Sequence, residues 1–225
     1  MARPARSAPK SFLDRVTRRV RRAGANLDAS TAASLDQYLQ LLALWNAKIN
    51  LTAFALQDPT DEAVDRLVVE PILASRQLPG GQVTLIDIGS GSGSPALPIA
   101  IASKGVTLTM VESKTRKAVF LSEAVRHLQL TARVETARFE QLLSKPEMHE
   151  AFDVLSIRAV RVEVKTLLTL QAFVRPGGQL FWFRGPSGPD VPPEPIFPLV
   201  WTSTTPLVEN LRSRLVILTK AASRR

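Results

Sequence analysis

The chain of 225 residues has no cysteine and only two histidines, His127 and His149. The absence of cysteine excludes disulfide bonds, cysteine-ligated zinc and thiol catalysis. Two histidines argue against a histidine-rich metal site, and we expect no metal. No uncharged apolar run reaches about 18 residues, so we expect no membrane-spanning segment and no membrane partner. A chain without cysteine fits a reducing compartment, which predicts a cytoplasmic protein.

Acidic residues are scarce in the first 25 positions, where Asp14 stands against eight basic residues: Arg3, Arg6, Lys10, Arg15, Arg18, Arg19, Arg21 and Arg22. This segment contributes +7 to a net charge of +9. Such a basic arm indicates a polyanionic partner such as nucleic acid. We predict RNA contacts at Arg18, Arg19 and Arg22. The alternative is a solvated tail or the exposed face of a helix.

Apolar residues recur at helical spacing over the first 75 residues or so. Phe12, Leu13, Val16 and Val20 predict a helix that stops at Gly24. A second helix begins after Asp28 or Ser30, either of which can cap it. Its apolar stripe consists of Leu35, Tyr38, Leu42, Trp45 and Ile49. We expect residues 1–11 to form a basic flexible tail and residues 12–75 a helical segment packed on the core.

From residue 83 onward, short apolar runs alternate with helical patterns. Strands are predicted at 83–88, 107–111, 132–135, 152–157, 179–183, 199–202 and 214–220, and helices at 95–103, 115–128, 139–143 and 162–174. Repeated strand–helix units predict an α/β fold with a mostly parallel sheet, helices on both faces and an antiparallel pair of strands at the end. The segment RPGG, residues 175–178, is predicted to be a tight turn.

A glycine-rich loop joins the first of these strands to the next helix within LIDIGSGSGSPALPIAIA, residues 85–102. Ligands of such sheets bind beyond the carboxyl ends of the strands, where glycine lets the backbone approach them closely. The loop lacks the lysine of a P-loop. Its G-x-G-x-G spacing also places the third glycine one residue earlier than the dinucleotide pattern. We predict that Gly89, Gly91 and Gly93 bind a cofactor.

Glu112 directly follows the second strand. A carboxylate at this position can accept hydrogen bonds from both ribose hydroxyls of a nucleoside. S-adenosylmethionine carries a ribose and no phosphate, which suits a loop without lysine or arginine. The alternative is that Glu112 only caps the helix that follows.

These features together resemble a class I S-adenosylmethionine-dependent methyltransferase, which implies a Rossmann-like sheet and that cofactor. Five segments resemble one family more specifically: LLALWNAKINLTA (41–53), DIGSGSGSPALPIAI (87–101), VESKTRKAVFL (111–121), TARFEQL (136–142) and DVLSIRAV (153–160). That family is the bacterial 16S ribosomal RNA guanine-N7 methyltransferases, once called glucose-inhibited division protein B. The resemblance implies a cofactor-binding domain over residues 76–225 and ribosomal RNA or the small ribosomal subunit as partner.

The resemblance also implies roles for individual residues. Gly89 and Ser94 match positions around the methionine part of the cofactor, and Phe139 and Glu140 match the pair beside its adenine. Arg158 matches an arginine of the active site, so we predict it to be catalytic and to contact the cofactor. Arg138 matches a further basic position.

The chain departs from the family pattern at several positions. The family has a larger apolar residue at Ser94 and a glycine at Ala96. Its His-x-x-Asp-Ser pattern is here Leu67-Val68-Val69-Glu70-Pro71, so the histidine is replaced. Arg116-Lys117 and Arg184-Gly185 replace Lys-Arg and Lys-Gly, and the proline-rich segment 186–198 has no counterpart that we recognise.

Arginines follow three of the predicted strands: Arg138 after the third, Arg158 and Arg161 after the fourth, and Arg184 after the fifth. They should gather at the carboxyl edge, where guanidinium groups favour an anionic substrate. We predict RNA contacts at Arg138, Arg161 and Arg184. The alternative is that these arginines pair with surface acids such as Glu140 and Glu163.

Methylation of guanine N7 needs no general base, because the nitrogen has a free lone pair. Catalysis would then rest on aligning the base with the methyl donor. Two other functions stay open at this point: a nucleotide-dependent oxidoreductase on a similar sheet, and an RNA-binding protein without catalytic activity. We expect a monomer.

Overall fold

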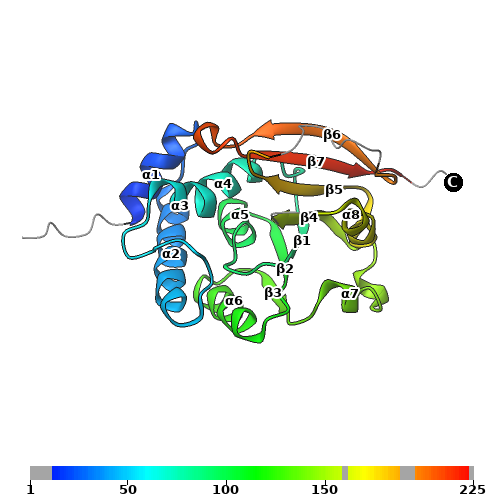
Figure 1. Cartoon of the computed structure of the whole chain (residues 1–225), viewed down its shortest axis with the longest axis horizontal. Coiled ribbons are helices and arrows are strands. Elements are labelled where there is room, and N and C mark those ends of the chain that lie inside the picture. Colours follow the sequence, from blue (N-terminus) through cyan, green and yellow to red (C-terminus); the bar gives the residue numbers. More distant parts are fainter. Residues whose placement is uncertain (1–11, 159–161, 188–195, 223–225) are drawn as a thin grey trace, which may run out of the picture.

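A computed structural model describes residues 12–158, 162–187 and 196–222, and these residues form a seven-stranded sheet surrounded by helices (Figure 1). Five strands run parallel: β1 (Val83–Ile88), β2 (Val106–Val111), β3 (Ala132–Glu135), β4 (Phe152–Arg158) and β5 (Val174–Arg184). The last two, β6 (Leu199–Pro206) and β7 (Arg214–Lys220), pair antiparallel, and β7 also pairs antiparallel with β5. The order β3-β2-β1-β4-β5-β7-β6 confirms the predicted fold class.

The N-terminal helices gather on one side of the sheet, at the left of Figure 1, and the arrow of β5 points toward them. They are α1 (Phe12–Arg22), α2 (Ala29–Ile49), α3 (Asp61–Val64), a π-helix η1 (Asp65–Val69) and α4 (Glu70–Ser75). The helices between strands are α5 (Ala96–Ala102), α6 (Thr115–His127), α7 (Phe139–Leu142) and α8 (Val164–Leu170). Short 3₁₀ turns lie at η2 (Pro146–Met148), η3 (Gln171–Phe173) and η4 (Glu209–Leu211).

Two clusters of buried apolar side chains cover the two faces of the sheet. One joins the N-terminal helices to the sheet and includes Tyr38, Leu42, Phe120 and Phe181. The other lies on the opposite face and is centred on residues such as Leu155. Because the first cluster is shared, the N-terminal helices are held in place by the same core that supports the strands.

Local contacts explain how the N-terminal helices start and stay docked. Asp28, one of the two predicted capping residues, caps α2. Its side chain accepts a hydrogen bond from the Thr31 N–H at 2.7 Å. This bond is the main reason that the pKa of Asp28 falls to about 2. Arg19 of α1 pairs with the buried Asp65 and, at 3.1 Å, with Asp61. These ion pairs attach α1 to η1.

The segment RPGG is not the tight turn that the sequence predicted. The helix predicted at 162–174 ends at Leu170, and β5 begins already at Val174, so RPGG lies inside the strand. The pairing of β4 with β5 shifts its register here, and Gly177 has a φ of +78°. A β-bulge uses glycine for the same backbone reason as a turn, which is why the residue pattern alone misled the prediction.

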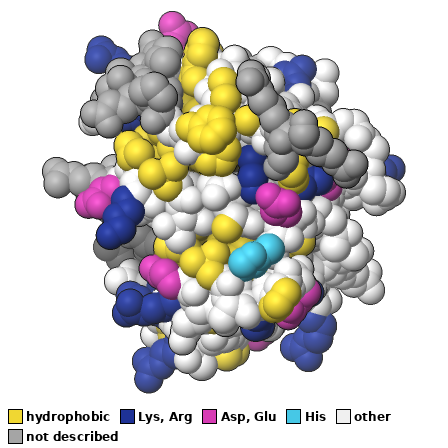
Figure 2. Space-filling model, turned by 90° about the vertical axis from the view of Figure 1, so that its right-hand side faces the viewer, with side chains coloured by type: hydrophobic (Ala, Val, Ile, Leu, Met, Phe, Trp, Pro, Cys, Tyr) yellow, Lys and Arg dark blue, Asp and Glu magenta, His cyan; other side chains and the backbone are white. Residues whose placement is uncertain are grey.

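The face of the molecule seen in Figure 2, on the side of α7 and α8, carries basic and acidic side chains interspersed with two groups of hydrophobic ones. Within the described residues, no helix is both long enough and apolar enough to cross a membrane.

Candidate functional site

The register of the parallel strands brings three predicted site residues to one edge. Ile88 is opposite Val111 of β2 on one side and Ile157 of β4 on the other. The next residues along these strands are Gly89, Glu112 and Arg158, so all three stand at the carboxyl edge next to one another. This is the position where parallel sheets bind ligands.

The glycine loop needs its glycines for two different reasons. Gly89, Gly91 and Gly93 all have positive φ, at +73°, +52° and +85°, a region that favours glycine. A Cβ added at Gly89 would meet no atom within 4 Å, so this position borders open space. A Cβ at Gly93 would lie 2.4 Å from Cδ1 of Leu97. Gly93 therefore serves packing, whereas Gly89 leaves room for a ligand.

Glu112 ties the loop to the strand edge. This residue is 7% exposed, and its carboxylate accepts hydrogen bonds from the Gly91 N–H at 2.9 Å and the Lys114 N–H at 2.8 Å. Lys114 precedes α6, so the helix-capping alternative is part of what Glu112 does. A carboxylate can accept about four hydrogen bonds, which leaves Glu112 capacity for a ligand hydroxyl as well.

Asp87 is a site residue that the sequence analysis missed. It lies beneath the loop at the end of β1, is 1% exposed, and accepts a hydrogen bond from Ser156 Oγ at 2.5 Å. Its other oxygen, Oδ2, is buried without a partner among the described residues. Burial raises the pKa of Asp87 to about 6. An acid in the otherwise apolar run Leu85–Ile88 was the signal that could have identified it.

Arg158 is held by residues of the N-terminal helices. Its Nη1 donates to the carbonyl of Arg66 in η1, and its Nη2 lies 3.1 Å from Oε2 of Glu70. The guanidinium also stacks over the ring of Phe183 at 4.7 Å from the centroid. Its Nε and Nη2 are buried and have no hydrogen-bond partner among the described residues, although Nη2 forms the ion pair with Glu70. Burial lowers the pKa of Arg158, and the carboxylate of Glu70 opposes that shift.

Ser94 and Tyr38 connect the loop to the same helices. Ser94 Oγ donates a hydrogen bond to the carbonyl of Leu67 in η1 at 2.9 Å. The serine, which stands where the family pattern has an apolar residue, therefore attaches the loop to η1. Tyr38, predicted only as a core residue of α2, is buried and donates its hydroxyl to the carbonyl of Ser92 at 3.0 Å. The loop is therefore supported from α2 and η1 together.

The predicted adenine-binding pair lies at the start of α7. Phe139 is half-buried, and Glu140 and the preceding Arg138 are exposed. The backbone N–H of Arg138 donates to Oε1 of Gln141 at 2.9 Å, which fixes the turn into the helix. Ligand contacts at these three residues stay predictions.

Arg184 stacks over the Trp182 ring at 4.4 Å and donates to the carbonyl of Ser187. Its RNA contact stays a prediction. Arg161 lies outside the described residues.

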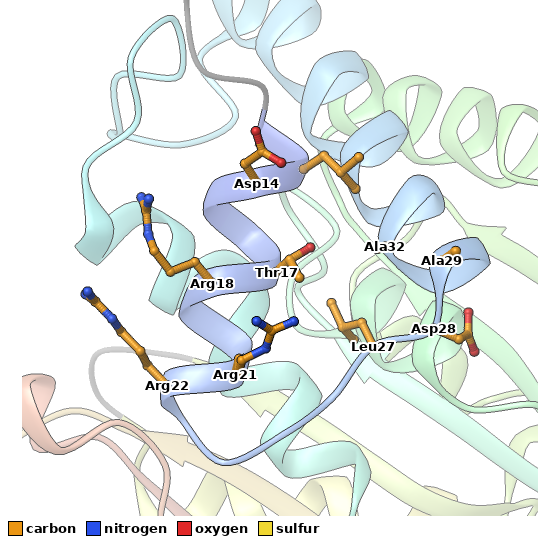
Figure 3. Close-up of a pocket in the computed structure, with 10 residues that line it drawn as sticks. Asp14, Thr17, Arg18, Arg21, Arg22, Leu27, Asp28, Ala29 and Ala32 are labelled. Carbon is orange, nitrogen blue, oxygen red and sulfur yellow. The ribbon is translucent and has the colours of Figure 1, made fainter.

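The arginines of α1 divide into two groups. Arg15 and Arg19 are ion-paired to Asp58, Asp61 and Asp65, so Arg19 has a structural role, and its RNA contact stays a prediction. Arg18, Arg21 and Arg22 are exposed and make no ion pair with a described residue. They line a hollow of about 650 Å³ between α1 and the start of α2 (Figure 3).

Comparisons with known proteins identify the chain's relatives. The family model described as rRNA small subunit methyltransferase G matches residues 31–190. Ribosomal RNA small subunit methyltransferase G of Xanthomonas euvesicatoria is 39% identical over 165 residues, which cover 71% of this chain and 72% of the relative.

Solved structures share the fold at low identity. An S-adenosylmethionine-dependent methyltransferase from Aquifex aeolicus has a TM-score of 0.51 and 15% identity, covering 68% of this chain and 91% of its own. The [4+2]-cyclase SpnF has a TM-score of 0.56 and 14% identity, covering 86% of this chain and 97% of its own. A cyclase on this fold shows that the sheet alone does not define the reaction. The sequence match identifies the family: this chain belongs to the rRNA small subunit methyltransferase G family.

Proposed function

We propose that this protein transfers the methyl group of S-adenosylmethionine to N7 of a guanine in the RNA of the small ribosomal subunit. The observation that carries the proposal is the carboxyl edge itself. In a chain of this family, it combines the glycine loop, Glu112 and a guanidinium with an unpaired nitrogen.

The residues of the edge fit S-adenosylmethionine in charge and shape. The unpaired Oδ2 of Asp87 suits the ammonium of the methionine part, and the open space at Gly89 lets the backbone lie against the ligand. Glu112 has acceptor capacity for the ribose hydroxyls. The half-buried Phe139 offers an apolar surface for the adenine, with Glu140 next to it.

The chemistry asks the protein for alignment more than for proton transfer. S-adenosylmethionine supplies an activated methyl group on a sulfonium, and guanine N7 supplies a free lone pair. The chain's residues therefore have to fix the positions of both partners and keep competing water out. No general base is required, which agrees with an edge built from glycines, acids and arginine.

Arg158 stands where donor and base must meet. Its free Nε suits an anionic oxygen, which can belong to the methionine carboxylate or to an RNA phosphate. A guanine O6 is a third acceptor for the same group. Because Arg158 follows Ile157, which is opposite Ile88 on the neighbouring strand, its backbone stands next to the start of the glycine loop, and each of these roles would place its side chain in contact with a reacting molecule.

We further propose that the exposed arginines of α1 bind RNA phosphates. In Figure 3, Arg18 and Arg22 extend in the same direction from α1, and Arg21 points toward Leu27. Arg19, on an adjoining face of α1, pairs with Asp65 of η1, and the carbonyl of the next residue, Arg66, accepts a hydrogen bond from Arg158. The hollow is therefore connected to the carboxyl edge through α1 and η1.

We propose a monomer that acts in the cytoplasm, where ribosomal subunits are found. Sedimentation of the purified protein with and without small subunits tests the monomer. A stable dimer that is required for activity would contradict it.

The test of the function is single-turnover transfer of a tritiated methyl group to small ribosomal subunits that lack the modification. We expect transfer by the wild type and a loss of about 10- to 100-fold in Arg158→Ala, because a charge-assisted hydrogen bond is worth about 1.5–3 kcal/mol. Arg158→Lys should recover only part, since an ammonium cannot replace a planar fork. If the wild type binds cofactor but transfers no methyl group, the protein is an RNA-binding protein without this activity.

The RNA contact has its own test with a matched control. Arg18→Gln with Arg22→Gln should weaken binding to a 16S ribosomal RNA transcript and reduce the slope of log affinity against log salt by about 1.4–1.8. Arg126→Gln with Arg133→Gln removes the same charge from exposed residues near the amino end of β3 and should leave the slope close to wild type. Equal slopes for both double variants would refute the contact.

A further inference from the structure

Glu70 is a buried acid that the sequence analysis noted only as a departure from the family pattern. It is the first residue of α4 and is 2% exposed. Its Oε1 accepts a hydrogen bond from Nη1 of Arg66 at 3.0 Å, and its Oε2 lies 3.1 Å from Nη2 of Arg158. A buried carboxylate is tolerated only when it is paired. Here one partner belongs to the helix itself and the other to the candidate active site.

The carbonyl of Arg66 takes part in the same arrangement for a reason found in the sequence. In the π-helix η1 the N–H of Glu70 bonds the carbonyl of Asp65, five residues earlier. The next bond in this pattern would join residue 71 to Arg66, but Pro71 has no N–H to donate. The carbonyl of Arg66 is thus left for side-chain donors, and Nη1 of Arg158 binds it.

Three contacts therefore fix the guanidinium of Arg158: the carbonyl of Arg66, the carboxylate of Glu70 and the face of the Phe183 ring. Nε and Nη2 have no hydrogen-bond partner among the described residues, but Nη2 lies in the ion pair with Glu70, so Nε is the nitrogen that faces no described partner of this network. A guanidinium held in this way presents its free N–H in one fixed direction, which is the condition for binding an anionic oxygen without a loss of side-chain entropy.

We propose that Glu70 is a positioning residue for methyl transfer, which acts by holding Arg158 so that its Nε can bind an anionic oxygen of the cofactor or the RNA. This inference rests on the proposed function. It means that the N-terminal helical segment completes the active site through η1 and α4.

Charge balance explains how removal of Glu70 would affect Arg158. Arg66 and Arg158 carry like charges and share this one carboxylate. Both side chains are 24% exposed, so each has a route to solvent. Without the negative charge between them the two guanidinium groups repel each other, and Arg158, which also loses one of its three contacts, is expected to be held less firmly in its position.

Asp65 provides a matched control on the same helix. It is also a carboxylate with 2% exposure and is also paired with an arginine, but its partner is Arg19 of α1. Glu70→Gln and Asp65→Asn are both expected to lower the thermal stability. Only Glu70→Gln should reduce kcat for methyl transfer to small ribosomal subunits, by about 10- to 100-fold with KM for the subunit little changed. Glu70→Asp should recover part of kcat.

Two further measurements separate positioning from a general structural role. Glu70→Gln should have little additional effect on kcat when Arg158 is already alanine, because both changes remove the same interaction. The Nε–H signal of Arg158 in a ¹H–¹⁵N spectrum, assigned by its absence in Arg158→Lys, should be lost in Glu70→Gln and kept in Asp65→Asn.

Cofactor affinity and the transfer rate of Glu70→Gln together identify which molecule supplies the anionic oxygen that Nε binds. A weaker affinity for S-adenosylmethionine in Glu70→Gln assigns the contact to the cofactor, and an unchanged affinity with slow transfer assigns it to the RNA. The proposal is overturned if Glu70→Gln and Asp65→Asn slow transfer equally, or if Glu70→Gln keeps the wild-type kcat. A wild type without methyl transfer would refute the proposed function instead, while the spectrum would still report whether Glu70 holds Arg158.

Discussion

Replacement of Gly89 by alanine is the most direct perturbation of the cofactor loop. The φ of +73° at this position costs an L-residue roughly 1–2 kcal/mol, but the new methyl group meets no protein atom within 4 Å. The variant is therefore expected to fold. The methyl group would instead occupy the space that the cofactor needs, so the affinity for S-adenosylmethionine should fall by about 100-fold or more, about 2.7 kcal/mol.

Two other glycines separate strain from loss of ligand space. Gly81 has a φ of +89° and open space around a Cβ, but it precedes β1 at the opposite edge of the sheet. Gly81→Ala should show the strain alone and bind cofactor normally. Gly93→Ala adds a contact of 2.4 Å with Leu97, so its stability should fall by a further 1–3 kcal/mol or so.

The assay combines calorimetric titration of S-adenosylmethionine with urea unfolding of the three variants. We expect Gly89→Ala to be as stable as Gly81→Ala and yet to bind cofactor far more weakly. Wild-type affinity in a folded Gly89→Ala protein would refute the assignment of this loop to the cofactor.

Three other predictions follow from buried polar groups. Because burial raises the pKa of Asp87 to about 6 from an ordinary 3.8, the folded chain holds its proton more tightly than the unfolded chain, and this group's contribution becomes less favourable as pH rises between these values. Asp87→Asn should therefore gain stability relative to wild type, by up to about 3 kcal/mol, between pH 4 and pH 7 in urea unfolding; a constant difference would contradict the buried acid. Tyr38→Phe removes the hydrogen bond to the Ser92 carbonyl and should lower the free energy of unfolding by about 0.5–1.5 kcal/mol. Calorimetric titration should also show a several-fold weaker cofactor affinity. Unchanged affinity would show that the loop does not need α2. Lys220→Met removes three hydrogen bonds of a buried ammonium, to Glu150 at 2.8 Å and to the carbonyls of Gln171 and Val174 at 3.0 Å. The free energy of unfolding should therefore fall by about 2–4 kcal/mol. Cofactor binding, at the opposite edge of the sheet, should stay as in wild type.

The parallel sheet was predictable because most of its strands are short, largely apolar runs that alternate with helical patterns. The same reasoning placed Gly89, Glu112 and Arg158 at one edge, since parallel strands end together. It failed at Gly177, where a bulge and a turn require the same residue type.

Pairing across long sequence separations could not be predicted in this way. Arg158 binds a carbonyl 92 residues earlier in the chain, and that carbonyl is available only because a π-helix meets Pro71. An acid such as Glu70 inside an apolar helix signals a buried partner but does not name it. Asp87 carried a similar signal, because burial of an acid in a strand requires a specific reason.

The central claim is that this chain methylates guanine N7 in small-subunit ribosomal RNA. The most direct measurement is mass spectrometry of nucleosides from small ribosomal subunits, isolated from cells that lack the protein and then incubated with purified protein and S-adenosylmethionine. We expect that one 7-methylguanosine per subunit is absent before incubation and restored by the wild type, but not by Gly89→Ala at the same cofactor concentration. Restoration of a different modified nucleoside, or of none by a protein that binds the cofactor, would contradict the claim.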